Sequence, residues 1–161
     1  MVPVSKMIEV AETGDTKEMA RLIERGADVN SKNEGGFPVL MLAAEQGHVA
    51  IVKLLLDRGA KVNAKWLDAR TALMWAALKG HTETAAMLLG HGANINAADI
   101  GGETALMWAA RYGRTETVAM LLDRGADVHA TNCIGQTARQ LAAYWGHSET
   151  VAMLLDRGAA V

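Results

Sequence analysis

The feature that most constrains this chain is a repeat of 33 residues. The segment GETALMWAARYGRTETVAMLLDRG, from Gly102 to Gly125, recurs with few changes from Ala69 to Gly92 and again from Gly135 to Gly158. Two series of glycines keep the same step without insertion or deletion: Gly14, Gly47, Gly80, Gly113 and Gly146, and Gly26, Gly59, Gly92, Gly125 and Gly158. A period of this size predicts a solenoid, in which stacked units contact only their neighbours.

Each unit carries two helical patterns joined by a turn. In the fourth copy Thr104 can cap a first helix with its hydroxyl. Leu106, Ala109 and Ala110 then recur at the spacing of one helical face. A second helix begins near Thr115, and an extended connection follows it. Because one such pair cannot bury its apolar faces alone, neighbouring units must cover it.

Composition disfavours several classes of protein. Half of the 161 residues are apolar, and the formal charge of −2 is unlike that of a nucleic-acid binder, which usually carries a basic excess. The longest apolar run, Ala72–Leu78, is too short to span a membrane, as is Val39–Ala44. The first residues, MVPVSKMIEV, lack the pattern of a secretory signal. Cys133 is the only cysteine, so we expect no internal disulfide and a reducing, cytoplasmic location.

The unit resembles the ankyrin repeat across the whole chain. The family's motif is matched by Thr104-Ala105-Leu106-Met107, by the alanine pair Ala109-Ala110, by Gly80-His81, by Leu121-Leu122, and by Gly26-Ala27-Asp28-Val29-Asn30. The resemblance implies one all-α solenoid domain over residues 1–161, with projecting β-hairpin loops and a concave groove. Its units are 1–32, 33–65, 66–98, 99–131 and 132–161, of which the first and last are caps.

Several positions depart from the family's pattern. Its proline is replaced at Val39, Ala72, Ala105 and Ala138, and its first-helix histidine at Met41, Met74, Met107 and Gln140. We therefore expect fewer hydrogen bonds between the loops. Trp66 begins one loop where the family prefers a polar residue, and Ala69 replaces that loop's glycine, so a distorted hairpin is expected there. Arg139 replaces a core leucine in the last unit, which suits an end cap near Val161 or, alternatively, a truncated array.

No pattern of residues predicts catalysis. Three of the five histidines, His48, His81 and His147, share one repeat position. The family uses that histidine to bridge backbone groups between units, and metal binding is the alternative. His129 and Cys133 are four residues apart but have no second pair of ligands, which gives a zinc site little support. We expect no enzymatic activity, no cofactor and no metal.

The best candidate for a binding surface is a second face along each first helix, where residue types vary between units. Trp108, Arg111 and Tyr112 share this face in the fourth unit. The equivalent positions carry Trp75, Leu78 and Lys79 in the third unit, and Tyr144 and Trp145 in the fifth. The loops add Phe37, Trp66, Leu67, Arg70, Ile100, Glu103, Ile134 and Gln136. Aromatic residues and arginine are enriched at the energetic centres of interfaces.

The resemblance and this surface together predict a non-catalytic scaffold that binds a protein partner through the groove and the hairpin tips, and neither nucleic acid nor membrane. Two alternatives remain open. The apolar loop tips can serve weak self-association in a structural role, and the clustered aromatic residues can form a small-molecule site in the groove. For Trp75 and Trp108, simple packing against neighbouring units is the competing interpretation.

Overall fold

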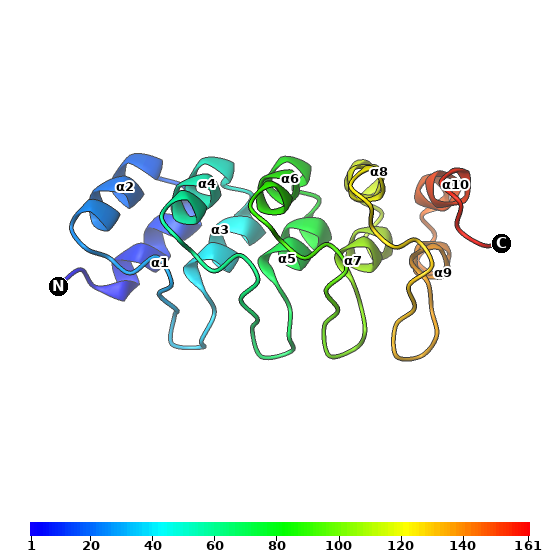
Figure 1. Cartoon of the computed structure of the whole chain (residues 1–161), viewed down its shortest axis with the longest axis horizontal. Helices are drawn as coiled ribbons and strands as arrows, with labels where there is room; N and C mark the ends of the chain where they lie inside the picture. Colours follow the sequence, from blue (N-terminus) through cyan, green and yellow to red (C-terminus); the bar gives the residue numbers. More distant parts are fainter.

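Two parallel rows of short helices form the body of the molecule in the computed structural model, which describes residues 1–161 (Figure 1). The odd-numbered row comprises α1 (Val4–Thr13), α3 (Val39–Gln46), α5 (Ala72–Lys79), α7 (Ala105–Arg111) and α9 (Ala138–Tyr144). The even-numbered row comprises α2 (Thr16–Glu24), α4 (Val49–Asp57), α6 (Thr82–Gly90), α8 (Thr115–Asp123) and α10 (Ser148–Asp156). The predicted all-α solenoid is confirmed.

Packing between units, rather than intrinsic helix propensity, stabilises these helices. Isolated helices shorter than about 12 residues are marginal in water, and the helices here have at most 10 residues. The alanine pairs Ala76-Ala77 and Ala109-Ala110 are completely buried, so neighbouring odd-numbered helices approach closely. Thr104 caps α7 as predicted, because its hydroxyl oxygen accepts a hydrogen bond from the Met107 amide at 3.4 Å.

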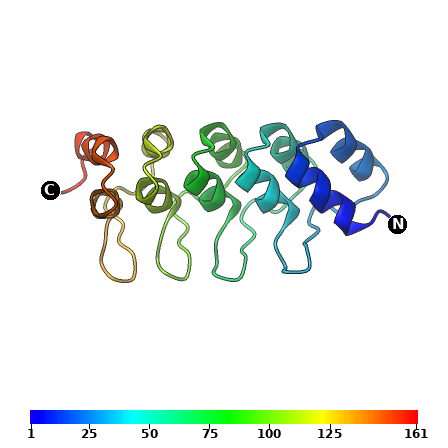
Figure 2. The same cartoon turned by 180° about the vertical axis from the view of Figure 1, so that it is seen from behind.

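Four loops project from the odd-numbered row and lie side by side, as Figure 2 shows from behind. They are not extended hairpins, since only the isolated bridges Lys32–Pro38 and Ala98–Thr104 are present. Hydrogen bonds link each loop to the one before it. The Ile100 amide donates to the Asp68 carbonyl at 2.8 Å, and the Cys133 amide donates to the Gly101 carbonyl at 2.9 Å. We call this hydrogen-bonded set, residues 33–37, 66–70, 99–103 and 132–136, the loop row.

The expected distortion of the Trp66 loop is wrong. The Trp66 amide donates to the Arg70 carbonyl at 3.0 Å, which is the bond that closes the other three loops. Ala69 adopts the left-handed conformation of a loop glycine, with φ of 64°. In addition, the Trp66 indole N–H donates to the Gly35 carbonyl at 2.9 Å, so this side chain makes the link that a backbone amide makes elsewhere. The loop row therefore continues through the substituted unit.

Replacing Ala69 by glycine is expected to raise the free energy of unfolding by about 0.5–1 kcal/mol. The left-handed region costs a residue with a Cβ about 1–2 kcal/mol, and the greater freedom of glycine in the unfolded chain offsets part of that gain. Urea unfolding followed by circular dichroism measures the change. Ala64→Gly, at a negative φ in the same connection, should instead lose stability. A loss of stability in Ala69→Gly would show that the strain is relieved in another way.

The turns between paired helices carry the predicted histidine bridges. The Nε2 atoms of His48, His81 and His147 lie 2.9 Å from the carbonyl oxygens of Glu12, Glu45 and Arg111, each in the preceding unit. Because a carbonyl can only accept, Nε2 is the protonated ring nitrogen. Arg114 occupies the same position in the fourth unit, and its Nε donates to the Leu78 carbonyl at 3.0 Å. The structural interpretation of these histidines is confirmed.

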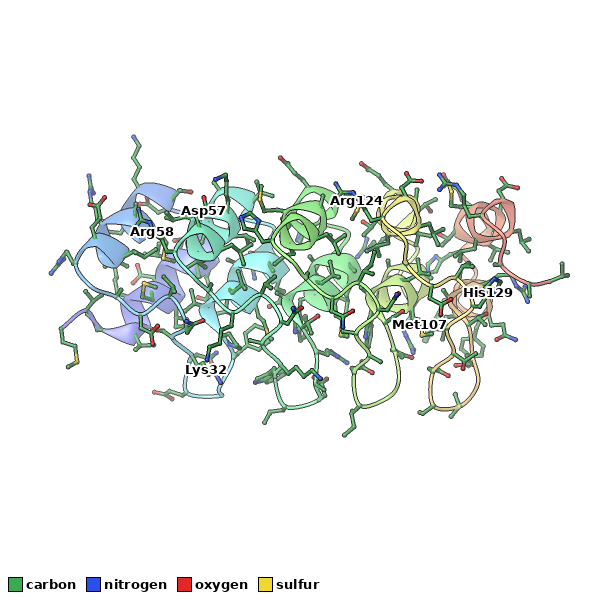
Figure 3. All side chains as sticks on the ribbon, in the orientation of Figure 1. Lys32, Asp57, Arg58, Met107, Arg124 and His129 are labelled. Carbon is green, nitrogen blue, oxygen red and sulfur yellow. The ribbon has the colours of Figure 1, made fainter.

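Charged side chains link the ends of the even-numbered helices. Figure 3 shows Asp57 at the end of α4 and Arg124 at the end of α8, in the row away from the loops. Asp57 Oδ1 lies 3.1 Å from His91 Nε2 in the next unit, and Asp123 pairs with Arg157 in the same way. At the unit between them, Gly90 stands where these aspartates are found, so Arg124 has no equivalent carboxylate.

His91 should make stability depend on pH. Its Nδ1 donates to the Met87 carbonyl at 3.0 Å and its Nε2 to Asp57, and these two bonds, in that order, raise the pKa of His91 above its ordinary value. The pKa of Asp57 is lowered, first by Lys53 and then by His91. A raised folded pKa gives a contribution that is complete below about pH 6.5 and is lost as the pH rises through the folded pKa.

The free energy of unfolding should therefore be lower at about pH 8.5 than at about pH 5.5, because histidine loses its proton between these two values. His91→Arg places at this position the residue found at Arg58, Arg124 and Arg157, and it should remove this part of the pH dependence. Urea unfolding of both proteins at both pH values gives the comparison. Parallel profiles for the two proteins would contradict the role of His91.

Candidate functional site

All aromatic side chains of the chain lie on one part of the fold. The four tryptophans, two tyrosines and one phenylalanine belong to the loop row or to the odd-numbered helices and the residues that directly follow them. The even-numbered helices carry none. We call the loop row together with the aromatic and charged side chains of the odd-numbered helices the aromatic face. Because the repeat would allow either row to carry aromatic residues, this asymmetry singles out the face for closer description.

Three rings pack together where the first two loops meet α5. The ring centroids of Phe37 and Trp66 are 4.9 Å apart, those of Phe37 and Trp75 are 5.4 Å apart, and both pairs meet edge to face. Phe37 is buried, and Trp66 and Trp75 are half-buried. The indole N–H of Trp75 is buried without a hydrogen-bond partner. These rings stabilise the contact between units, which supports the packing interpretation for Trp75.

Arg70 connects this cluster to the next unit. Its guanidinium carbon lies 5.2 Å from the ring centroid of Trp75 and 4.2 Å from that of Trp108. The Asp68 carboxylate lies 2.9 Å from Arg70 Nε, and the Asp99 carboxylate lies 3.8 Å from it. Asp99 also accepts a hydrogen bond from the Trp108 indole at 3.0 Å. The orientation of Trp108 is thus set by side chains from two loops.

Arg111 and Glu103 hold the other side of Trp108. The guanidinium carbon of Arg111 lies 5.2 Å from the Trp108 ring centroid, and its Nη2 pairs with Glu103 Oε1. The Glu103 side chain is only 9% exposed, and it also accepts a hydrogen bond from Asn132 Nδ2 at 3.4 Å. Glu103 therefore acts as a buried anchor for Arg111 and for the last loop. Trp108, with guanidinium groups from two units against it, is itself buried.

A cleft opens at the end of α7. It has a volume of about 310 Å³ and is lined by Trp108, Arg111, Tyr112, Trp145 and His147. The rings of Trp108 and Tyr112 are nearly parallel, at 18°, with centroids 6.3 Å apart. Tyr112 is 46% exposed and Trp145 is 53% exposed, so both can contact another molecule. We call this the α7–α9 cleft.

The structure separates the predicted site residues by exposure. Phe37, Glu103 and Trp108 are buried; Trp66, Arg70, Trp75, Leu78, Arg111 and Gln136 are half-buried; Leu67, Lys79, Ile100, Tyr112, Ile134, Tyr144 and Trp145 are exposed. A chain of ring and guanidinium contacts joins Phe37, Trp66, Trp75, Arg70, Trp108, Arg111 and Tyr112. Leu67, Ile100 and Ile134 take no part in it and project from the loops, where they are 82%, 80% and 74% exposed.

Sequence reasoning missed the residues that orient this face. Asp99 and Asn132 begin their loops, and each accepts backbone amides of its own loop, such as Glu103 N to Asp99 Oδ1 at 2.9 Å. An aspartate or asparagine before a glycine-containing turn indicates such a loop. It does not indicate that Asp99 also binds Trp108. His147 is predicted to bridge backbone groups, with metal binding as the alternative, and it also lines the α7–α9 cleft.

Two general findings bear on the kind of site. No group of three or more histidine, cysteine, aspartate or glutamate side chains is placed to hold a metal ion. None of the ten helices combines the length and the apolar character needed to cross a bilayer.

Comparison with known proteins agrees with the motifs described above. A family model for ankyrin repeats in three copies matches the chain at residues 7–99, 62–132 and 96–161. No curated protein matches the chain in sequence. The three matches together extend over residues 7–161, which include all four loops and nine complete helices. The chain therefore belongs to the ankyrin-repeat family.

Proposed function

We propose that this protein is a non-catalytic scaffold that binds a protein partner across the aromatic face. Ankyrin repeats are in general protein–protein interaction modules. The observation that carries the proposal is the confinement of every aromatic ring to the loop row and the odd-numbered helices. Trp, Tyr and Arg are the residues most enriched at interface hot spots. We also propose a reducing location such as the cytoplasm, since Cys133 is the single cysteine.

The residues of this face have two roles in the proposal. The buried residues Phe37, Glu103 and Trp108 hold their neighbours in place, and of these three only Trp108 lines the α7–α9 cleft. The exposed residues supply the contacts, and Tyr112 and Trp145 are the leading ones because they combine large apolar area with open access. Side chains already ordered in the free protein lose less conformational entropy on binding, which increases affinity.

Affinity capture from a cell extract tests the proposal when the wild-type chain is compared with Tyr112→Ala/Trp145→Ala. We expect proteins captured by the wild type to be lost with the double variant, whose folding is checked by circular dichroism. Leu155→Ala is the control, because it removes an exposed apolar side chain from α10, outside the aromatic face. Equal capture by all three proteins would contradict binding through the aromatic face.

A second candidate function is self-association in a structural role. The exposed aliphatic side chains of Leu67 and Ile100 occupy equivalent positions in consecutive loops. Exposed apolar patches on soluble proteins commonly mark contact sites. Sedimentation velocity at increasing protein concentration tests this candidate, and Leu67→Ser/Ile100→Ser should abolish any concentration dependence. A constant monomeric sedimentation coefficient would remove it.

A further inference from the structure

The tips of the loop row carry exposed apolar side chains that take no part in ordering the aromatic face. Leu67 and Ile100 occupy equivalent positions in the second and third loops, and Ile134 lies in the fourth. None of the three belongs to the chain of ring and guanidinium contacts. Because hydrogen bonds join these loops to one another, the three side chains form one patch with a fixed spacing. Exposed apolar patches commonly mark contact sites.

A second copy of the chain matches the spacing of this patch. All four loops come from the same repeat of 33 residues, and Figure 2 shows them side by side. The loop row of a second copy therefore has the same spacing, so several pairs of tips can meet at once. A twofold axis brings one patch onto the same patch of the other copy, and this is the commonest symmetry of soluble oligomers. The patch is thus complementary in spacing to itself.

Two twofold arrangements bring the tips of two loop rows together. In a parallel pair, each loop faces the same loop of the second copy. In an antiparallel pair, the second loop of one copy faces the third loop of the other, and the first faces the fourth. Leu67 of one copy then meets Ile100 of the other, and the reverse contact forms across the axis. Glu34 and Cys133, which are equivalent in the repeat, face each other at both ends.

The exposed charges of the loop row favour the antiparallel pair. Lys32, Glu34 and Lys65 are exposed in or directly beside the first two loops, and Figure 3 labels Lys32 there. The other two loops contain only the charged residues Asp99 and Glu103, whose side chains are 5% and 9% exposed. A parallel pair would bring each charged loop against the same charges. An antiparallel pair brings it against a loop without exposed charge, which avoids this repulsion.

We propose that two copies of the protein form an antiparallel dimer through the tips of the loop row. Leu67 of each copy packs against Ile100 of the other, and Ile134 packs against the first loop of the other copy. The centre of the contact is therefore apolar and its ends are more polar, as in other interfaces. The inference rests on the second candidate function above, and it adds the orientation of the two copies and the residues that meet.

The size of the patch sets the strength of this dimer. Burial of one leucine or isoleucine side chain removes roughly 100 Å² of apolar surface from water. The three apolar tips of each copy therefore contribute roughly 600 Å² to the dimer, whereas specific, stable interfaces bury about 1,200 Å² or more. The dimer should be weak, and it should be populated only at high protein concentration.

Crosslinking between cysteines tests the orientation. In Glu34→Cys, an antiparallel pair brings the new thiol close to Cys133 of the second copy, and a bismaleimide with a short spacer should join the two chains. The wild type and Glu34→Cys/Cys133→Ser each have a thiol in one loop only, so both should remain monomeric after the same treatment. Glu34 and Cys133 lie in the first and last loops of the row, and a denaturing gel distinguishes a crosslinked dimer from a monomer.

Two further variants show whether the apolar tips hold the dimer together. Adding Leu67→Ser/Ile100→Ser to Glu34→Cys should abolish the crosslink, because the central apolar contacts are lost. Adding Leu155→Ala instead should leave the crosslink unchanged, because this exposed side chain belongs to α10, away from the loops. Circular dichroism checks that every variant is folded.

The outcomes separate the inference from the candidate function on which it rests. Dimers that are crosslinked through Cys133 in the wild type would show a parallel pair, which overturns the inference but keeps self-association. Concentration-dependent sedimentation without a crosslink in Glu34→Cys would also overturn the inference alone, because the copies would then meet elsewhere. A crosslink that survives Leu67→Ser/Ile100→Ser would contradict the role of the tips. A constant monomeric sedimentation coefficient with no crosslink in any variant would overturn both.

Discussion

Arg111→Met is expected to lower the free energy of unfolding by about 3 kcal/mol, because it leaves a buried carboxylate without its cation. The Glu103 side chain is 9% exposed and that of Arg111 is 24% exposed, so water compensates little of the lost interaction. Asn132 Nδ2, at 3.4 Å, is then the only side-chain donor left to the Glu103 carboxylate. Methionine keeps much of the apolar contact with Trp108, so the charge is the main change. Urea unfolding followed by circular dichroism gives the free energy.

Two further variants separate the buried charge from other effects. Adding Glu103→Gln to Arg111→Met should recover most of the lost stability, because the uncompensated charge is gone. Lys79→Met removes an exposed cation whose Nζ lies 3.7 Å from Glu45 Oε1, and its effect should stay within about 0.5 kcal/mol. If Arg111→Met costs no more than Lys79→Met, Glu103 is not the buried anchor described above.

Gly113→Ala is expected to cost about 2 kcal/mol or more, whereas Gly146→Ala at the equivalent position should cost about 1 kcal/mol. Both glycines have positive φ, of 64° and 77°. A Cβ on Gly113 would lie 2.5 Å from His147 Nδ1, but a Cβ on Gly146 would meet nothing within 4 Å. The first substitution therefore displaces the His147 ring from the Arg111 carbonyl as well as straining the backbone. Thermal and urea unfolding of the two variants give the difference.

The His147→Ala background shows whether the ring is responsible. In this background Gly113→Ala should cost about as much as Gly146→Ala does in the wild type, since only the backbone strain remains. If Gly113→Ala lowers the free energy of unfolding as much in the His147→Ala background as in the wild type, the clash with His147 is not the cause.

The 33-residue period predicts most of the fold because each unit repeats the same local signals. Thr104, the alanine pairs and the turn glycines all act within a few residues of themselves, so their roles follow from spacing alone. The histidine bridges were predictable from the family resemblance. The Trp66 loop was not, because its indole bonds to Gly35 in another unit, at a distance in sequence that no local pattern encodes.

For the aromatic face, the sequence predicted which residues share a helix face but not how exposed each one is. Trp108 and Tyr112 are four residues apart on the same face, yet the first is 8% exposed and the second 46%. The difference arises because Arg70, from the preceding unit, covers Trp108 and Asp99 binds its indole. Such contacts depend on side-chain conformations in neighbouring units, which periodicity does not specify.

Most of the hydrogen bonds between units have a common direction, and the bond from Asn63 Nδ2 to the Gly92 carbonyl of the next unit is an exception. At the helix turns, His48, His81, Arg114 and His147 all donate to a carbonyl of the preceding unit, and in the loop row the amides of Ile100 and Cys133 do the same. During synthesis the earlier unit leaves the ribosome first. Each emerging unit then brings most of its donors to acceptors that are already in place, so the array can become ordered from its N-terminal end.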